Sequence, residues 1–278
     1  MRQYAIIITL LLGITPSINS QSFKLMTYNI RYDTSNDGEN QWSERKDFLS
    51  NQISFYSPDV FGIQEGLHHQ LLYLNETLIN YKYVGVGRDD GQEKGEYCAI
   101  FYNSKKLKLI KSDTFWLSET PNKISVGWDA SMERICTYIL LKDVKTNQQF
   151  WVFNTHFDHI GNEARINSTA LIFDKINELN SENTPVILMG DFNLTPDSKP
   201  IQYLSKVMND SKNSSKSKPF GPIGTFNGFH FNEPVSKRID YIFTSKNNIK
   251  VVKYAVLSDS KNLKYPSDHL PVFVKIKL

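Results

Sequence analysis

Short apolar runs alternate along the chain with longer segments in which apolar residues recur every three or four positions. The short runs predict buried β-strands, at residues 23–30, 60–63, 81–87, 96–102, 107–115, 134–141, 150–155, 186–189, 239–244, 249–257 and 272–276. The longer segments predict helices at residues 44–55, 67–78, 163–179 and 201–207. Because strands outnumber helices and the two are interleaved, we expect packed α+β or α/β layers rather than a βαβ series. Residues 209–219, rich in Ser, Lys and Asn, predict an exposed loop.

The first 20 residues have the layout of a secretory signal peptide. Arg2 precedes an apolar run at residues 5–14, and small or polar residues follow as far as Ser20. The run is short for a membrane span, although an uncleaved N-terminal anchor is the alternative. No later stretch is apolar enough to cross a bilayer. We therefore expect a periplasmic or secreted protein with a single domain over residues 21–278.

The composition of this 278-residue chain limits the kinds of partner and bound metal that we expect. Its 32 basic residues nearly balance 29 acidic ones, leaving a formal charge of +3, so the balance does not indicate a dedicated nucleic-acid-binding protein. The two cysteines, Cys98 and Cys136, lie in strand-like runs. They are either a disulfide, which export permits, or buried thiols. Two cysteines with this spacing do not form a zinc site.

The strand predicted at residues 186–189 is followed directly by Gly190, Asp191 and Asn193. Taken alone, this pattern is also common in ordinary turns. Other predicted strands, however, begin or end beside polar residues of catalytic type: Asn29, Glu65, Asn154, His156, Asp240, Asp268 and His269. Because so many strands begin or end beside such residues, we expect these side chains to meet at one shared edge, or rim, of the packed sheets. Catalytic residues are usually found in such places.

These residue types favour one kind of reaction. Carboxylate and amide oxygens are hard ligands that suit Mg²⁺, Mn²⁺ or Ca²⁺. The chain has no Gly-x-Ser-x-Gly elbow and no His-Glu-x-x-His, which disfavours acyl transfer and zinc proteolysis. Metal-assisted hydrolysis of a phosphate ester is the reaction that remains.

Six short motifs stand in a fixed order along the chain. They are Met-Thr-Tyr-Asn-Ile at 26–30, Gln-Glu at 64–65, Asn-Thr-His at 154–156, Gly-Asp-Phe-Asn at 190–193, Arg-Ile-Asp-Tyr-Ile at 238–242 and Ser-Asp-His-x-Pro at 267–271. In this order the set resembles the endonuclease/exonuclease/phosphatase superfamily, which includes deoxyribonuclease I, abasic-site endonucleases, sphingomyelinases and inositol-polyphosphate 5-phosphatases. The resemblance covers residues 23–278. It implies a four-layer α/β sandwich, with two packed mixed β-sheets flanked by helices.

The resemblance also implies a metal site and a water-activating pair. Glu65 would be the main metal ligand with Asn29 beside it, and Asp268 would touch a metal or a metal-bound water. Asp191 would orient or deprotonate the attacking water, while Asn193 would hold the phosphate and position Asp191.

The remaining implied roles concern the substrate. His269 would donate to a phosphate oxygen and Asp240 would hold its tautomer. His156 resembles a second phosphate-facing histidine with Glu96 as its paired acid; a core histidine and a strand-edge charge are the alternatives. We assign Arg134 and Asn154 to substrate binding, although Arg134 would equally brace Glu96.

Two positions depart from the abasic-site nucleases, which carry an acidic residue where this chain has Arg31 and a Tyr where it has His156. Residues 116–121 and 127–130 are similar to a bacterial, uncharacterised branch. We therefore expect a monomeric, exported, metal-dependent phosphodiesterase or phosphomonoesterase. Its substrate would be a small phosphate ester, a sugar phosphate or a lipid headgroup, with nucleic acid possible. The alternatives are a secreted deoxyribonuclease I-like endonuclease and a non-catalytic binding module on the same fold.

Overall fold

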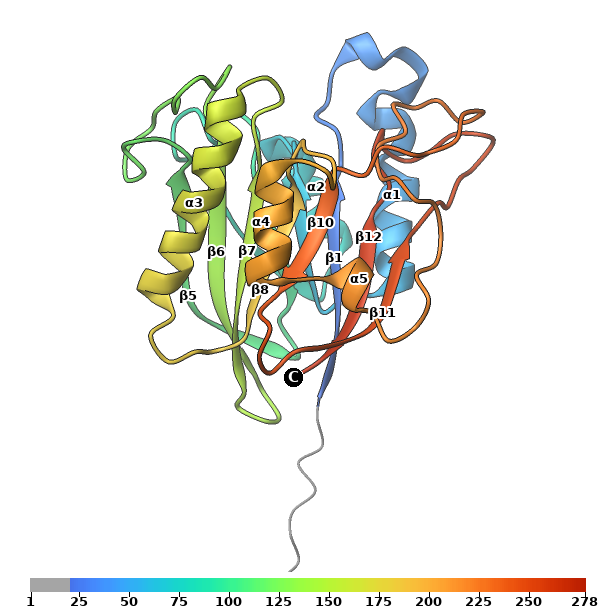
Figure 1. The fold of residues 1–278 in the computed structure, drawn as a ribbon. Helices are drawn as coiled ribbons and strands as arrows, with labels where there is room; N and C mark the ends of the chain where they lie inside the picture. Colours follow the sequence, from blue (N-terminus) through green and yellow to red (C-terminus); the bar gives the residue numbers. More distant parts are fainter. Residues whose placement is uncertain (1–20) are drawn as a thin grey trace, which may run out of the picture.

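The computed structural model describes residues 21–278, so the predicted signal peptide at 1–20 lies outside the described residues. Two six-stranded mixed sheets pack face to face with helices outside them, which confirms the expected four-layer sandwich (Figure 1). The first sheet has the order β11 (Lys250–Val256), β12 (Val272–Lys277), β1 (Ser22–Asn29), β2 (Val60–Gln64), β4 (Ile100–Asn103) and β3 (Tyr81–Val84). The second has the order β5 (Leu107–Trp116), β6 (Ile135–Asp143), β7 (Gln149–His156), β8 (Val186–Asp191), β10 (Asp240–Thr244) and β9 (Asn209–Asp210).

The two central strands of each sheet run parallel, and all other neighbouring strands pair antiparallel. In the first sheet β1 and β2 end together, with Asn29 opposite Gln64. In the second sheet β7 and β8 end together, with His156 opposite Asp191. Parallel pairing places the carboxyl ends of neighbouring strands at one edge, and each sheet thus delivers a pair of polar residues to the same rim.

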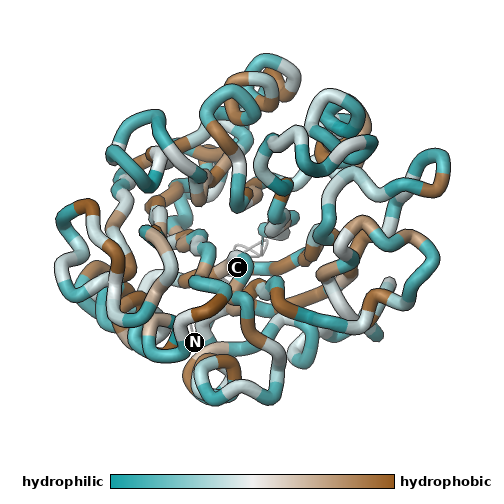
Figure 2. The backbone as a smooth tube through the Cα atoms, turned by 90° about the horizontal axis from the view of Figure 1, so that it is seen from above, coloured by the Kyte–Doolittle hydropathy of each residue, from teal (hydrophilic) through white to brown (hydrophobic). Residues whose placement is uncertain are grey.

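Apolar side chains fill the space between the sheets and the space beneath each helical layer. The inner faces of both sheets share one buried cluster that includes Phe23, Leu25, Val152, Ile187, Ile242 and Val274. Helices α1 (Trp42–Tyr56) and α2 (His68–Thr77) cover the first sheet, and α3 (Asn162–Leu179) and α4 (Lys199–Val207) cover the second. Seen from above, the helices lie on the outer sides of the molecule and the peripheral loops are largely hydrophilic (Figure 2).

Two segments differ from the sequence-based expectation. The strand expected at 96–102 is regular only from Ile100, because residues before it cross the rim and Tyr97 makes isolated bridges to Gly66 and Gly87. The exposed loop expected at 209–219 instead contains β9 and the short helix α5 (Ser211–Ser214). Buried Asp210 anchors this segment. A 3-10 helix (Ser35–Asn40) also lies in the loop after β1.

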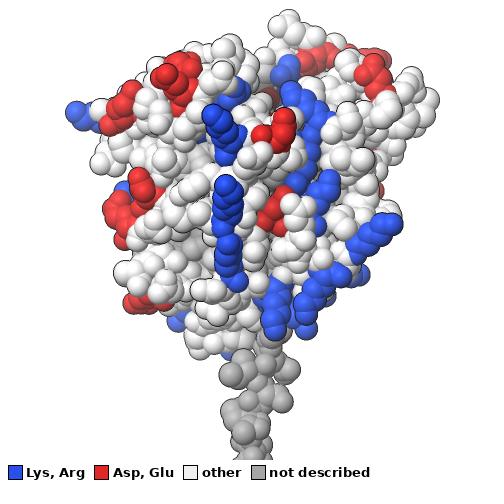
Figure 3. Space-filling model, in the orientation of Figure 1, with Lys and Arg blue, Asp and Glu red and all other residues white. Residues whose placement is uncertain are grey.

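Both cysteines are buried free thiols, so the structure holds the second of the two options that the sequence left open. Between residues 21 and 278, no helix is both long enough and apolar enough to cross a bilayer. On the face shown in Figure 3, basic side chains are interspersed with acidic ones, as the near-neutral composition leads one to expect.

Candidate active site

Asn29 joins polar groups from the two sheets at the rim. Its Nδ2 donates to Glu65 Oε1 at 2.9 Å and to Asp191 Oδ2 at 3.0 Å. Its Oδ1 accepts from the backbone N–H of Arg31 at 3.0 Å. Because Asn29 is fully buried at the end of β1, it holds the carboxylate that follows β2 close to the carboxylate that ends β8.

Three non-glycine residues of the rim have a left-handed backbone. These are Arg31 (φ 57°), Glu65 (φ 63°) and Asn193 (φ 50°). Such conformations are uncommon outside glycine and are found at functional sites, where the surrounding structure holds them. Gly190, directly before Asp191, has φ 147°, and a Cβ there would lie 2.0 Å from the Thr155 carbonyl oxygen. Only glycine allows β8 to pass this close to β7.

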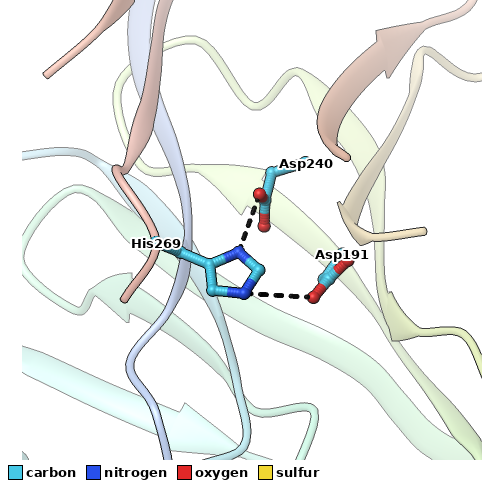
Figure 4. A group of neighbouring side chains, drawn as sticks. All are labelled: Asp191, Asp240 and His269. Carbon is cyan, nitrogen blue, oxygen red and sulfur yellow. Dashed lines mark hydrogen bonds and ion pairs between the residues drawn. The ribbon is translucent and has the colours of Figure 1, made fainter. Parts of the chain in front are cut away.

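His269, Asp240 and Asp191 form a buried cluster (Figure 4). His269 Nδ1 lies 2.9 Å from Asp240 Oδ2, and its Nε2 lies 3.7 Å from Asp191 Oδ2. Burial opposes a charge on His269, but the two carboxylates outweigh it and raise its pKa well above the ordinary value. Burial, reinforced by the Asp240 charge, raises the pKa of Asp191 to about 7. The cluster therefore pairs a cationic imidazole with a carboxyl group poised near neutrality.

Asn193 fixes the second histidine, His156, in its neutral form. Asn193 Nδ2 donates to the Phe157 carbonyl oxygen at 3.0 Å, which identifies it as the nitrogen, and it also lies 3.1 Å from His156 Nε2. His156 Nε2 therefore accepts, and the ring proton is on Nδ1. Burial, followed by the charges of Arg134 and Arg88, lowers the pKa of His156 well below its usual value.

Glu96 pairs with Arg88 rather than with His156. Arg88 Nη1 and Nη2 donate to the two Glu96 oxygens at 2.7 and 2.9 Å. The His156 Nδ1 to Glu96 Oε2 distance is 3.7 Å, beyond a hydrogen bond. Burial, followed by the charge of Glu65, raises the pKa of Glu96 to about 7. The acid thus lies beside His156 as expected, but a residue that the sequence reasoning missed holds it.

Arg134 is held by the loop that follows β7. Its Nε donates to Asp158 Oδ2 at 3.3 Å and its Nη2 donates to His159 Nδ1 at 3.0 Å. Asp158 also accepts the backbone N–H groups of Ile160 and Gly161. Arg134 does not contact Glu96 by a hydrogen bond, so it braces the loop rather than the acid.

The structure places Asn154 between the sheets and not at the cavity. Its Nδ2 donates to the carbonyl oxygens of Ile63 and Ala99 at 2.8 and 2.9 Å, and its Oδ1 accepts from Gln64 Nε2 at 2.6 Å. The side chain is fully buried and all its hydrogen-bonding groups are used. Asn154 thus ties the second sheet to the first, and its amide is committed to this role instead of facing the cavity where we expected it to bind substrate.

An open cavity of about 480 Å³ lies over the rim. Its lining includes eight of the expected site residues: Glu65, Glu96, Arg134, His156, Asp191, Asn193, Asp268 and His269. It also includes Arg31, Tyr32, Arg88, Met132, His159, Phe226, Lys237 and Ile239. Sequence reasoning did not assign Arg88 or Lys237 a role. Arg88 lies in a polar loop that carries no pattern to distinguish it, whereas Lys237 stands directly before the Arg-Ile-Asp motif.

Two sets of side chains at the rim are suited to a cation. Ligand atoms of Asp191, Asp240 and His269 lie within 4.8 Å of one another. In that set, however, His269 Nδ1 and Asp240 already bond to each other. Glu65 offers hard oxygens next to Asp191, and Asp268 Oδ2 lies 4.0 Å from Arg31 Nε, which also faces Glu65. The donor chemistry fits a divalent metal held by Glu65 and its neighbours.

The model of the endonuclease/exonuclease/phosphatase family matches residues 26–269. The chain belongs to this family. Its members are phosphoesterase hydrolases and generally depend on a divalent metal. The resemblance carried by the six motifs, the enzyme class and the four-layer fold are thereby confirmed.

Solved structures from bacteria are similar over nearly the whole chain. A mannosyl-6-phosphatase from Bacteroides thetaiotaomicron is 38% identical, with a TM-score of 0.87, over 91% of this chain and 99% of that one. An endonuclease/exonuclease/phosphatase family protein from the same species is 37% identical, with a TM-score of 0.88, over 93% and 98%. Their source agrees with the expected bacterial branch.

Curated relatives are more distant. An uncharacterized protein of Acanthamoeba polyphaga mimivirus is 31% identical over 160 residues, which are 55% of this chain and 59% of that protein. Human tyrosyl-DNA phosphodiesterase 2 is 26% identical over 187 residues, 65% of this chain and 44% of that protein. The chain spans about half the length of the curated relatives it matches.

Proposed function

We propose that this protein is an exported, divalent-metal-dependent phosphomonoesterase that hydrolyses a sugar phosphate. The observation that carries the substrate class is the 38% identity to a mannosyl-6-phosphatase over 91% of this chain. The open cavity agrees with it, because about 480 Å³ accommodates a sugar ring together with its phosphate. Export rests on the signal-peptide layout of residues 1–20.

In this proposal Asp191 takes the proton of the attacking water. A carboxyl group with a pKa of about 7 is suited to general-base catalysis near neutral pH. The backbone N–H of Asn193 donates to Asp191 Oδ1 at 2.9 Å, which orients the base. Both side-chain N–H bonds of Asn193 are committed to Phe157 and His156, so in this structure the amide positions neighbouring groups instead of offering a donor to the phosphate. Asn29 supports the same carboxylate from the first sheet.

His269 stabilises the negative charge that develops on the phosphate. Its Nδ1–H is committed to Asp240, so Nε2–H faces the cavity and donates to a non-bridging oxygen. A metal held by Glu65 and its neighbours supplies charge neutralisation for the phosphate when bound. Arg31 faces the same end, with its guanidinium held by Asp37 at 2.9 and 3.0 Å.

A substrate panel tests the proposal. Purified protein is assayed with hexose 6-phosphates, phenyl phosphate, bis-p-nitrophenyl phosphate, sphingomyelin, inositol phosphates and plasmid DNA, each with Mg²⁺, Mn²⁺, Ca²⁺ or EDTA. We expect hexose phosphates to give the highest kcat/KM and EDTA to abolish turnover. Preferred cleavage of DNA that declines as salt rises would favour the nuclease alternative instead. An absence of turnover with every metal would favour the binding module.

Export has a separate test. Expression of the full chain in a bacterial host should yield a shortened protein outside the cytoplasm. Its N-terminal sequence should begin near residue 21. A full-length chain that stays with the membrane fraction would indicate the uncleaved anchor.

A further inference from the structure

We infer that Glu96, Arg88 and His159 form a second subsite, which binds hydroxyl groups on the neutral ring of the substrate. This inference rests on the proposed function, because it concerns the part of a sugar phosphate that does not react. All three side chains line the cavity. They come from the loop before β4 and the loop after β7, which lie beside the reacting groups.

Glu96 is a fixed hydrogen-bond acceptor in the cavity wall. Both of its oxygens accept from the Arg88 guanidinium, which sets the plane of the carboxylate. Each oxygen keeps a lone pair free, and 16% of the side chain is exposed. Arg88 itself is positioned from behind, since its carbonyl oxygen accepts the indole N–H of Trp116 at 2.8 Å. The carboxylate is therefore held ready for a ligand hydroxyl.

His159 complements this acceptor with a donor. An arginine can only donate, so the 3.0 Å contact from Arg134 Nη2 makes His159 Nδ1 the acceptor. The ring proton is then on Nε2. Among the described residues no hydrogen-bond partner of Nε2 is found, and His159 is an exposed residue of the cavity lining. Arg134 is anchored by Asp158, which keeps the ring in this orientation.

The charged side chains of this subsite and its support are paired with one another, which indicates an uncharged ligand. The positive charge of Arg88 is balanced by Glu96, and that of Arg134 by Asp158. A site for a second phosphate would need a surplus of positive charge, because burying an anion without compensation is expensive. A hydroxyl group both donates and accepts, which matches a cavity lining that offers a carboxylate acceptor and an imidazole N–H donor. These groups of the cavity lining thus suit the hydroxyl groups of a sugar.

His156 sets the spacing between the subsite and the chemistry. Its Nε2 lies 3.6 Å from Asp191 Oδ2, and its Nδ1 lies 3.7 Å from Glu96 Oε2. Asp191 at the reacting end and Glu96 in the subsite are consequently separated by one imidazole ring. A ligand with its phosphate beside Asp191 places the attached ring against Glu96. Binding energy from a non-reacting group can then be used to orient the phosphate.

The first test compares a hexose 6-phosphate with phenyl phosphate, which has no ring hydroxyls. Glu96→Gln and His159→Ala should each lower the ratio of the two kcat/KM values by about 10-fold, mainly through KM for the sugar. Glu178→Gln removes a carboxylate from an exposed pair on α3 and should leave the ratio unchanged. An equal loss for both substrates would overturn the inference and assign Glu96 to the chemical step.

A second test does not depend on turnover. In an Asp191→Asn background, calorimetry compares the affinity for hexose 6-phosphate with that for inorganic phosphate. The sugar should tighten binding about 10-fold or more, and Glu96→Gln should remove that gain. If the sugar adds no affinity, the subsite is overturned even where phosphomonoesters are hydrolysed. If the sugar adds affinity but no phosphomonoester is hydrolysed, the subsite stands and the proposed function fails.

Discussion

Asp240 holds His269 by a hydrogen bond of 2.9 Å between Oδ2 and Nδ1, and both side chains are buried at the ends of their segments. The pairing is tertiary, since Asp240 begins β10 and His269 precedes β12 in the other sheet. It leaves only Nε2 of the imidazole to face the cavity. Through this bond the second sheet sets the tautomer and charge of a histidine that is carried by the first.

Replacing Asp240 with Asn tests that bond. The amide keeps the shape of the side chain but removes the charge that favours the imidazolium, so we expect kcat to fall by about 100-fold or more. KM should change little, because ground-state contacts with the substrate are retained. Steady-state kinetics at neutral pH measure both. Unchanged kcat in a folded Asp240→Asn variant would contradict the role of His269 as charge donor.

Metal removal should abolish activity while the fold persists. Glu65 and Asp191 are both held by Asn29, so we expect the metal-binding carboxylate and the general base to stay in place without an ion. We expect dialysis against EDTA to remove turnover and Mg²⁺ to restore it, with circular dichroism unchanged throughout. Asp191→Ala, Glu65→Ala and His269→Ala should each lose most turnover even with excess Mg²⁺. Full metal-dependent activity in Asp191→Ala would contradict the proposed role of Asp191 as general base.

Gly190→Ala should destabilise the protein by about 3 kcal/mol, because the new Cβ would meet the Thr155 carbonyl oxygen at 2.0 Å. Urea unfolding followed by fluorescence measures the change. Gly38→Ala is a matched control, since Gly38 also has a positive φ, +54°, but nothing lies within 4 Å of a Cβ there. Its cost, which comes from backbone strain alone, should be smaller than that of Gly190→Ala. Equal effects of the two variants would show that backbone conformation, rather than the close approach of β7, requires glycine at 190.

Arg238 and Asp210 form a buried ion pair, with Nη1 to Oδ2 at 2.8 Å and Nη2 to Oδ1 at 2.5 Å. Arg238→Met should cost about 3 to 5 kcal/mol of unfolding free energy, because it leaves the Asp210 carboxylate buried and uncompensated. The double variant Arg238→Met/Asp210→Asn should recover part of that loss. Thermal and urea unfolding of the three proteins check the order. A double variant less stable than Arg238→Met would exclude uncompensated charge as the cause.

The free energy of unfolding should depend on pH through Asp158. Burial works against its charge, but hydrogen bonds from Gly161, Ser131 and Ile160 prevail and lower its pKa below the ordinary value of 3.8. A carboxyl group with a depressed folded-state pKa stabilises the protein above its unfolded pKa and loses that contribution as pH falls through the folded pKa. Asp158→Asn should therefore cost about 2 kcal/mol at pH 7 and progressively less below about pH 4. A difference that stays constant between pH 7 and pH 2 would contradict this account.

Much of the fold and part of the site could be predicted from the sequence. Strand periodicity and the polar residues next to strand ends are local patterns, and they located Asn29, Glu65, Asp191 and His269 before any contact was known. Local signals also marked Gly190, since a glycine between a buried strand and a carboxylate indicates an unusual backbone.

Other features needed the tertiary structure. Asn154 and His156 lie two residues apart on one strand, yet one ties the sheets together and the other reaches the rim. That difference depends on which residues of another sheet face each position, and no local pattern encodes it. The same holds for Asp210, whose partner Arg238 is 28 residues away.

The sequence by itself determined the family, the layers and the acids and amides at the strand ends. These features follow from the spacing of apolar residues and from the order of the motifs, both of which can be read without knowing any tertiary contact. Only the tertiary structure decided that Arg88 hydrogen-bonds to Glu96 and that Arg134 orients His159. It also decided that these two pairs of side chains face one cavity. The physical reason is that the loop carrying Arg88 and Glu96 precedes β4 of the first sheet, whereas Arg134 and His159 flank β6 and β7 of the second. The two pairs therefore face one cavity only because the two sheets pack together.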